Sequence, residues 1–365
     1  MTAPTTDRTS RAVPRGRSHT IPFPVRTVGP VRLIGVDEPT EVWVPLATLE
    51  TPLWPSVARG ARATREAGGI HVAVVREGMT RSVLLEAPSA LEAARIGAAL
   101  QAREADLAQV ATTGSRFARF QRLHWEVCGR LLFVRLELWT GDAAGHNMVT
   151  RAAQQVLDWM VREWPQLRAV SVSANYCTDK KVSAVNGLMG RGRFVVAECE
   201  LPSSICCRIL RSSPVAIEEL NVRKNLLGSS LAGSLRSANA HFANMLLALY
   251  LATGQDAANI VEGSQGTTWA EAQPDSLYFS VTLPNVVVGT VGAGKVLPWV
   301  RQHLQLLGCT SGSEPGRAAQ RLAMIAAAVV LCGELSLLAA LTNPGELVRT
   351  HLRLERAGTD SETSE

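Results

Sequence analysis

The sequence predicts an α+β protein in which a large mixed domain is interrupted by a smaller, inserted α/β domain. The chain has 365 residues, 46% of them hydrophobic, and this length exceeds what one simple domain usually holds. Strands and helical segments alternate in the first half, whereas helices dominate from residue 296 onward. Between them, a run of helix, two strands, helix and strand has the size of a domain of its own. Two folding units are therefore expected.

Each expected element rests on a local pattern. Short β-branched, partly alternating runs predict strands at 42–47 and 70–75, and the stretch 56–66 between them has helical character. The inserted unit follows, with its helices and strands at residues 88–110, 117–127, 131–139, 147–164 and 169–173. The large domain then resumes, with a strand at 194–201, a helix at 240–253, a strand at 277–283 and helices over 296–351.

The longest apolar run, at residues 324–341, is interrupted by Glu334 and Ser336 and is rich in small residues. This composition suits a buried core helix better than a membrane span, so no membrane contact is expected. Both ends of the chain have the biased composition of tails. The expected boundaries are a disordered tail at 1–20, a discontinuous large domain at 21–82 and 172–351, an inserted domain at 83–171, and a flexible tail at 352–365.

Composition excludes several classes of function. A formal charge of +5, evenly mixed along the chain, is too small for a nucleic-acid-binding surface, and 5% aromatic residues argue against stacking on single strands. The seven cysteines form no C-x-x-C pair, so neither a disulfide framework nor a metal site is expected. The N-terminus lacks the apolar segment of a signal peptide. These features indicate a soluble protein of the reducing cytoplasm.

Lysine is rare in this chain, and two of its four lysines are adjacent. Lys180 and Lys181 follow Asp179 in the segment NYCTDKK, just after a predicted strand. Because a lysine ammonium is a compact charge whose pKa shifts on burial, its use in an arginine-rich chain indicates a point-charge or proton-transfer role. An ordinary solvated turn is the alternative.

A glycine-rich loop at residues 289–295, GTVGAGK, matches the G-x-x-x-x-G-K pattern of a phosphate-binding loop. It follows a hydrophobic run, as such a loop should. However, Val296 stands where Ser or Thr would bind magnesium. A nucleotide hydrolase and a tightly packed glycine turn are both possible interpretations.

The stretch 221–244 brings Lys224, His241 and Asn244 together with several glycines. Glycine there allows close backbone approach to a ligand, although a helix-capping loop would explain the same pattern.

Four scattered residues add up to a set that can handle protons. Glu50, Lys180, Asp256 and His351 would supply two carboxylates, an ammonium and an imidazole. Taken alone, Asp256 is equally explained as a helix N-cap.

Six motifs occur in a fixed order along the chain: NYCTDKK, KNLLG, NAHFAN, ATGQDAAN, GTVGAG and GELSLLAAL. In this order and spacing they resemble 3-hydroxy-3-methylglutaryl-coenzyme A (HMG-CoA) reductase over residues 22–352, and most closely its short soluble bacterial forms related to the NADPH-using class. The resemblance implies a large HMG-CoA-binding domain with an inserted ferredoxin-like NADPH-binding domain. It also implies an enzyme of the mevalonate pathway that reduces HMG-CoA with two NADPH, through mevaldehyde, to mevalonate and CoA.

The resemblance assigns catalytic roles to the same four residues. Lys180 would stabilise the oxyanion that forms as hydride reaches the carbonyl. Glu50 would donate a proton at the mevaldehyde step, which requires a buried carboxyl, and Asp256 would tune the pair. His351 would protonate the departing CoA thiolate.

Binding roles follow from the resemblance in the same way. HMG-CoA would meet Arg59, Arg62, Arg81, Ser173, Asp179, Lys181, Arg211, Lys224, His241 and Asn244. NADPH would meet Ser115, Arg116, Asp142, Gly145, His146, Asn147, Met148, Val291 and Gly292. His146 replaces a family methionine and is a candidate for contact with a 2′-phosphate.

The active sites of the family lie between subunits, which implies a homodimer or a higher homo-oligomer. The chain lacks the family's ENVIG segment near residues 18–30, a part of the dimer contact, and has TLETPLWPS around Glu50. Two alternatives stay open: a nucleotide hydrolase that uses Gly289 to Lys295, and a non-catalytic paralogue that acts as a binding partner.

Overall fold

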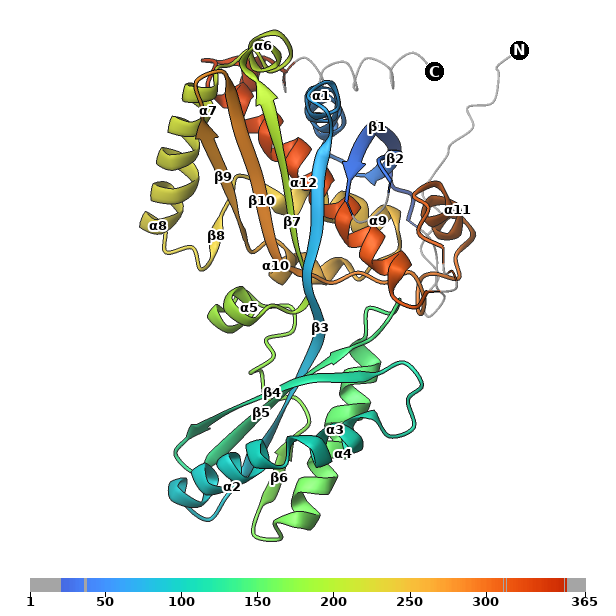
Figure 1. Ribbon diagram of the computed structural model, residues 1–365, viewed down its shortest axis with the longest axis vertical. Helices are drawn as coiled ribbons and strands as arrows, with labels where there is room; N and C mark the ends of the chain where they lie inside the picture. Colours follow the sequence, from blue (N-terminus) through green and yellow to red (C-terminus); the bar gives the residue numbers. More distant parts are fainter. Residues whose placement is uncertain (1–20, 36–37, 311, 313, 351, 353–365) are drawn as a thin grey trace, which may run out of the picture.

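Two lobes joined by one long strand make up the protein (Figure 1). The computed structural model describes residues 21–35, 38–310, 312, 314–350 and 352. Buried hydrophobic residues form two separate cores. The larger core draws on residues 28–72 and 195–339, and the smaller on residues 79–167 together with Val287. Two cores support the expected pair of folding units, whose boundaries stay a prediction.

The elements of the large lobe surround a mixed sheet. In chain order they are β1 (Val25–Ile34), β2 (Thr40–Ala47), α1 (Leu53–Glu66), the first half of β3 (Ile70–Glu86), α5 (Ala184–Met189), β7 (Gly192–Pro202), α6 (Ser203–Ile205), η1 (Cys206–Leu210), α7 (Pro214–Leu220), η2 (Asn221–Gly228), α8 (Ser229–Leu231), β8 (Ser237–Ala238), α9 (Phe242–Ala252), η3 (Ala257–Asn259), α10 (Ile260–Gly263), β9 (Gly266–Ala272), β10 (Ser276–Val286), α11 (Pro298–Leu306) and α12 (Arg317–Leu341). The strand order is β2-β1-β3-β7-β10-β9-β8.

The small lobe adds an antiparallel sheet to the second half of β3. Its own elements are α2 (Ala90–Ala102), α3 (Glu104–Thr112), β4 (Arg119–Cys128), β5 (Leu131–Trp139), α4 (His146–Glu163) and β6 (Arg168–Ser171). β5 pairs with β3 and β4, and β6 pairs with the other edge of β3. The resulting βαββαβ order supports the expected ferredoxin-like arrangement.

Strand β3 connects the lobes because it belongs to both sheets. Residues 71–78 pair with β7, and residues 79–86 pair with β5. The strand is therefore 17 residues long, whereas local pattern predicted only residues 70–75. The segment REGMTRS is mostly polar, so the second half of β3 shows no hydrophobic strand pattern. Neighbouring strands on both of its edges nevertheless pair with its backbone N–H and C=O groups.

Two other expectations about elements need correction. The helix predicted at 88–110 is two helices, α2 and α3, separated at Arg103, whose backbone leaves the helical region with φ −108°. Strands β1 and β9 were not predicted: β1 carries Gly29 and Pro30 in its middle, and the alternate buried positions of β9 are Gly, Thr and Ala, which give no hydrophobic period of two.

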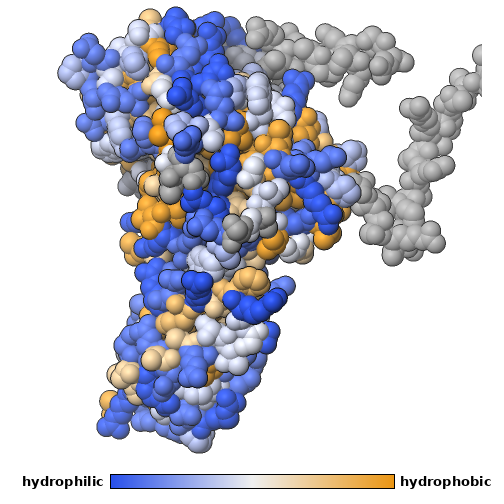
Figure 2. Space-filling model, turned by 45° about the vertical axis from the view of Figure 1, so that its right-hand side comes forward, coloured by the Kyte–Doolittle hydropathy of each residue, from blue (hydrophilic) through white to orange (hydrophobic). Residues whose placement is uncertain are grey.

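Helix α12 is the centre of the large lobe, as its apolar run predicted. It is the one described helix long and apolar enough to cross a membrane, and 94% of its apolar window is buried inside the protein. It packs on α1, α9 and the sheet. On the face that Figure 2 shows, hydrophilic residues cover most of the surface and hydrophobic residues form separate patches.

Replacing Gly60 by alanine should destabilise the protein. Helices α1 and α12 approach so closely at Gly60 that an added Cβ would lie 2.0 Å from the carbonyl oxygen of Cys332. Because that obstacle is helix backbone, we expect a loss of about 1–3 kcal/mol in the free energy of unfolding, measured by urea denaturation.

The matched control is Gly228→Ala. Its added Cβ would meet only the Arg223 carbonyl oxygen, at an ordinary 3.6 Å, so unfolding should change little or become slightly harder. A Gly60→Ala protein as stable as this control would contradict the close packing of α1 on α12.

Candidate active site

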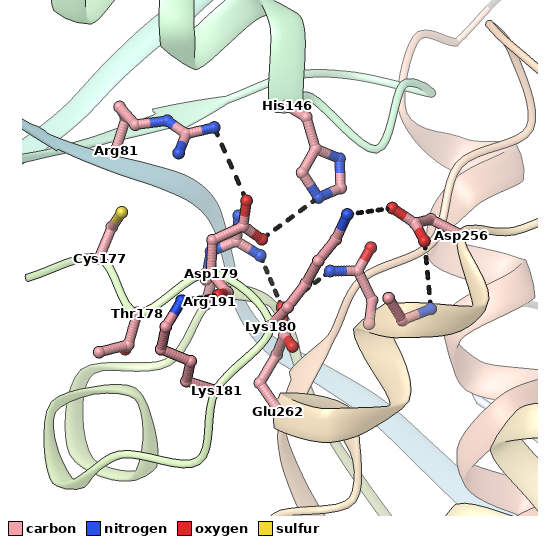
Figure 3. Close-up of polar contacts among 12 residues, drawn as sticks. Arg81, His146, Cys177, Thr178, Asp179, Lys180, Lys181, Arg191, Asp256 and Glu262 are labelled. Carbon is pink, nitrogen blue, oxygen red and sulfur yellow. Dashed lines mark hydrogen bonds and ion pairs between the residues drawn. The ribbon is translucent and has the colours of Figure 1, made fainter. Parts of the chain in front are cut away.

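An ion pair between Lys180 and Asp256 forms where the two lobes meet (Figure 3). Lys180 Nζ lies 2.7 Å from Asp256 Oδ2, and Asp256 Oδ1 accepts a hydrogen bond from the Ala258 amide at 3.1 Å. Asp256 is thus both an N-cap, of η3, and the partner of Lys180. The two proposed roles of this aspartate are compatible because its two oxygens do different work.

The charges of this pair reinforce each other. The hydrogen bond to Asp256 raises the pKa of Lys180 above its usual value. Burial opposes ionisation of Asp256, but the hydrogen bonds from Lys180 and Ala258 outweigh it and lower the pKa of the carboxyl. Both groups are therefore charged at neutral pH. Their side chains are 41% and 45% exposed, so the ammonium is open to a ligand.

The backbone around Lys180 is strained. Asn175, Thr178 and Lys180 have φ of 58°, 41° and 56°, three of the five described non-glycine residues with positive φ. Each costs about 1–2 kcal/mol and persists only where its surroundings impose it. Here Thr178 Oγ1 lies 2.6 Å from Ser183 Oγ, and Asn186 donates to the Thr178 carbonyl. Strain concentrated in one segment is typical of a functional loop.

A buried arginine, Arg191, holds the loop that carries Lys180 in place. Arg191 is fully buried and lies 2.9 Å from Asp179 Oδ1 and 2.8 Å from Glu262 Oε1. Arg81 adds a longer contact to Asp179, at 3.8 Å, and a hydrogen bond to Ser173. Asp179 is therefore held from two sides, one residue before Lys180.

The N-terminus of α4 faces the same place from the small lobe. Gly145 is the N-cap of α4, with φ 95°, and no side chain caps the free amides of the helix. His146 Nε2 is buried without a hydrogen bond, 3.8 Å from Asp179 Oδ1. Burial, and next the nearby Arg191, lower the pKa of His146 to about 4. The imidazole is therefore neutral at pH 7 and offers a ligand a hydrogen bond but no charge.

Five of these residues line one cavity of about 460 Å³ between the lobes: Arg81, His146, Asp179, Lys180 and Asp256. Its walls come from the start of α4, from the Lys180 loop, from residues 254–256 and from the glycine loop 291–295. Of the residues assigned to NADPH, the cavity contains Gly145, His146, Asn147, Met148, Val291 and Gly292.

A second cavity, of about 390 Å³, lies in the large lobe and contains Glu50. Asn244 Nδ2 donates to Glu50 Oε2 at 2.8 Å, and His241 lines the same wall. His241 Nε2 lies 3.1 Å from the Gly333 carbonyl oxygen. Arg59 and Arg211 line the cavity too, so two of the four arginines assigned to HMG-CoA are placed near Glu50.

The four expected catalytic residues do not meet within the described chain. Glu50 lines one cavity while Lys180 and Asp256 line the other, and Asp256 pairs with Lys180, not with Glu50. Glu50 is also exposed, so the expectation of a buried carboxyl is wrong for the single chain. His351 lies outside the described residues, although Thr350 before it lines the Glu50 cavity.

Several assigned binding residues lie apart from both cavities. They are Arg62, which pairs with Glu66; Ser115, which caps the Ala118 amide; Arg116, which stacks on Phe117; and Lys224, whose Nζ lies 3.5 Å from Asn225 Oδ1. Asp142 also lines neither, because its carboxylate accepts from the Ala319 amide at the start of α12. Ser173 and Lys181 lie beside the first cavity through their contacts with Arg81 and with the Asp179 carbonyl.

The nucleotide-hydrolase interpretation of residues 289–295 is wrong. A phosphate loop continues from its lysine directly into a helix, but here α11 begins only at Pro298. The loop instead forms a bridge from Val291 to Ala143 of the small lobe.

Three buried residues beneath the Lys180 loop were not among the predicted site residues. Arg191, Glu262 and Asn259 form a buried network, with Asn259 Nδ2 donating to Glu262 Oε1 at 2.8 Å. The one available signal was Asn259, in the GQDAAN motif. The local sequence GRGR around Arg191 does not distinguish a buried arginine from an exposed one.

Comparison with known proteins assigns the chain to a family. The sequence model of the family described as Hydroxymethylglutaryl-coenzyme A reductase matches residues 19–356. The chain belongs to the HMG-CoA reductase family. It is 43% identical over 340 residues to 3-hydroxy-3-methylglutaryl-coenzyme A reductase of Aeropyrum pernix, covering 93% of this chain and 80% of that protein.

Other relatives are longer than this HMG-CoA reductase family member. The reductase of Phycomyces blakesleeanus is 41% identical over 94% of this chain, which spans only 29% of its length. Among solved structures, the class II HMG-CoA reductase of Streptococcus pneumoniae bound to NADPH is similar with a TM-score of 0.70 and 22% identity, covering 90% of this chain and 88% of that one. That likeness establishes the fold.

Proposed function

We propose that this chain is an HMG-CoA reductase that converts HMG-CoA, through mevaldehyde, to mevalonate and CoA with two NADPH, as a step of the mevalonate pathway. The observation that carries the proposal is the Lys180–Asp256 pair on the wall of the cavity between the lobes. A charged, half-exposed ammonium there can stabilise the negative charge that develops on a reduced carbonyl oxygen.

The residues of this cavity fit a dinucleotide. Free amides at the start of α4 and the glycine loop suit phosphate groups, and an added Cβ at Gly292 would meet nothing within 4 Å. The orphaned Nε2 of His146 supplies a further polar contact. NADPH supplies the hydride when bound, and Gly145, His146, Asn147, Met148, Val291 and Gly292 are the residues that would hold it.

The chain's own groups divide the remaining chemistry. Lys180 stabilises the oxyanion, and Asp256 keeps the ammonium charged and aimed. Glu50, oriented by Asn244, donates a proton at the mevaldehyde step. His351 protonates the CoA thiolate as it leaves, and Arg59 and Arg211 meet the anionic CoA.

We infer that the site is completed by a second copy of the chain. Glu50 and Lys180 line different cavities of one chain, so a proton donor and an oxyanion-stabilising group come together only if another subunit brings its Glu50 to this Lys180. Leu227, Leu231 and Leu235 are 56%, 90% and 44% exposed, which supplies an apolar surface that another subunit can cover. The seven cysteines are all free, which favours the reducing cytoplasm as the compartment.

Incubation of the protein with HMG-CoA tests the proposal. We expect two NADPH to be oxidised for each CoA thiol released, followed by absorbance at 340 nm and by a thiol reagent. NADH in place of NADPH measures the cofactor preference in the same assay. A protein that turns over HMG-CoA with neither cofactor would refute the function and would favour a non-catalytic paralogue.

A further inference from the structure

Lys295 has no place among the roles assigned so far, although it lines the cavity between the lobes together with Lys180 and Asp256. It closes the glycine loop, and its amide donates to the Gly292 carbonyl at 3.2 Å. Its side chain is turned inward, where Nζ donates a hydrogen bond to the carbonyl oxygen of Gly254. The lysine thus ends two residues from Asp256.

The glycine loop is held against the Asp256 segment at both of its ends. At the first end, the Gly289 amide donates to Gln255 Oε1 at 2.9 Å. At the other, the backbones of Gly294 and Gly254 touch, since a Cβ added to Gly294 would lie 2.8 Å from the Gly254 carbonyl oxygen. The loop that carries Lys295 is therefore held by contacts that do not depend on the charge of Lys295.

The charge of Lys295 lacks a counter-charge among the residues that the structure describes. No carboxylate of the described residues forms an ion pair with it, and its bonded acceptor is a neutral carbonyl. Burial alone lowers the pKa of Lys295 to about 8. An ammonium has three donors, so one hydrogen bond to Gly254 leaves two for a ligand. A half-buried cation with unused donors on a cavity wall suits an anion.

We propose that Lys295 binds a phosphate group of the dinucleotide cofactor, either the 2′-phosphate or the pyrophosphate. This inference rests on the proposed function, because it takes NADPH as the occupant of the cavity. The phosphate supplies the missing counter-charge, and the hydrogen bond to Gly254 transmits the position of the bound phosphate to the segment that carries Asp256.

The proposal predicts how cofactor binding depends on pH. In the free protein Lys295 loses its proton as the pH rises through about 8, so affinity for NADPH should fall above that pH. The other titratable or charged groups on the cavity wall are Arg81, His146, Asp179, Lys180 and Asp256. The pKa of His146 is about 4, that of Asp256 is lowered and that of Lys180 is raised. Each of these shifts takes the pKa away from the pH near 8 at which Lys295 loses its proton. His303 of α11 contacts the Ala252 carbonyl and does not line the cavity.

The test is binding of NADPH and NADH to the full chain without HMG-CoA, by titration calorimetry between pH 6.5 and 9.5. For Lys295→Gln we expect a dissociation constant for NADPH raised roughly 10- to 100-fold at pH 7. Lys295→Arg keeps its charge throughout this range, so its affinity should stay flat where that of the unchanged protein falls. The control Arg301→Gln removes one charge from the exposed face of α11 and should bind like the unchanged protein.

The cofactor comparison identifies the phosphate. A loss confined to NADPH assigns Lys295 to the 2′-phosphate, and an equal loss for both cofactors assigns it to the pyrophosphate. Equal affinities of Lys295→Gln and the unchanged protein for both cofactors would overturn the inference while leaving the proposed function intact. An unchanged protein that binds neither cofactor would instead overturn the proposed function. If Lys295→Gln fails to fold, the pH profile of Lys295→Arg decides: a decline like that of the unchanged protein overturns the inference.

Discussion

Replacing Lys180 by arginine should abolish turnover of HMG-CoA while the fold stays intact. The variant keeps the positive charge, but a broad planar guanidinium replaces a compact ammonium 2.7 Å from Asp256. Loss of one aimed oxyanion-stabilising group costs about 100- to 1000-fold in kcat. The side chain is 41% exposed, so unfolding should change little. Steady-state kinetics with HMG-CoA and NADPH, together with a urea melt, separate the two effects.

Lys181→Arg is the matched comparison. Lys181 is adjacent and exposed, and its ammonium contacts only the Asp179 carbonyl among the described residues. We expect a loss of about tenfold or less, since its contact is with a neutral group. Turnover of Lys180→Arg equal to that of the unchanged protein would refute the role given to Lys180.

Substitution of Lys180 also tests whether each active site takes residues from two subunits. Lys180→Met and Glu50→Gln should each be inactive. If one subunit supplies Glu50 and another Lys180, a mixed dimer of the two variants holds one intact site, and an equal mixture that exchanges subunits should regain about a quarter of the activity. A mixture that exchanges subunits but stays inactive would show that both residues of a site come from one chain.

Replacing Arg191 by methionine should cost more stability than any exposed substitution in this chain. The guanidinium is fully buried between Asp179 and Glu262, and Glu262 is also fully buried. Without Arg191, the Glu262 carboxylate is left without its cation, a change that costs about 3–5 kcal/mol. Urea denaturation at pH 7 measures the loss.

The pH dependence of this loss has a definite sign. Burial already raises the pKa of Glu262 above its usual value, and Arg191 opposes that rise. In Arg191→Met the pKa must rise further, so the carboxyl takes up a proton as the pH falls and the buried charge disappears. The penalty relative to the unchanged protein should therefore shrink from pH 7 toward pH 5.

Two further variants check the cause. Arg191→Met with Glu262→Gln removes both charges and should recover part of the stability. Arg208→Met removes an exposed arginine from its pair with Glu66 and should change unfolding little. A single Arg191→Met variant as stable as Arg208→Met would mean that Arg191 is not the buried support of the Lys180 loop.

The course of β3 shows the limit of local pattern. Its apolar beginning was readable, but its continuation through Arg76, Glu77 and Thr80 was not, because these polar residues have the appearance of a loop. Hydrogen bonds to other segments hold these polar residues in the strand: Arg76 donates to the Leu188 carbonyl, and Trp139 donates to Glu77. Helix α12 is the opposite case, since its length and apolar composition predicted its burial without knowledge of neighbours.

The same division holds at the candidate site. The sequence by itself predicted which residues would carry the chemistry, because Lys180, Asp256 and Glu50 lie in motifs whose residue types and spacing are local. Only the tertiary structure decided that Lys180 pairs with Asp256, that Glu50 lines another cavity, and that Arg191 and Glu262 pair across 71 residues of chain. The physical reason is that burial and charge pairing depend on what other segments bring. The sequence does not show whether an arginine is solvated or is buried against a carboxylate.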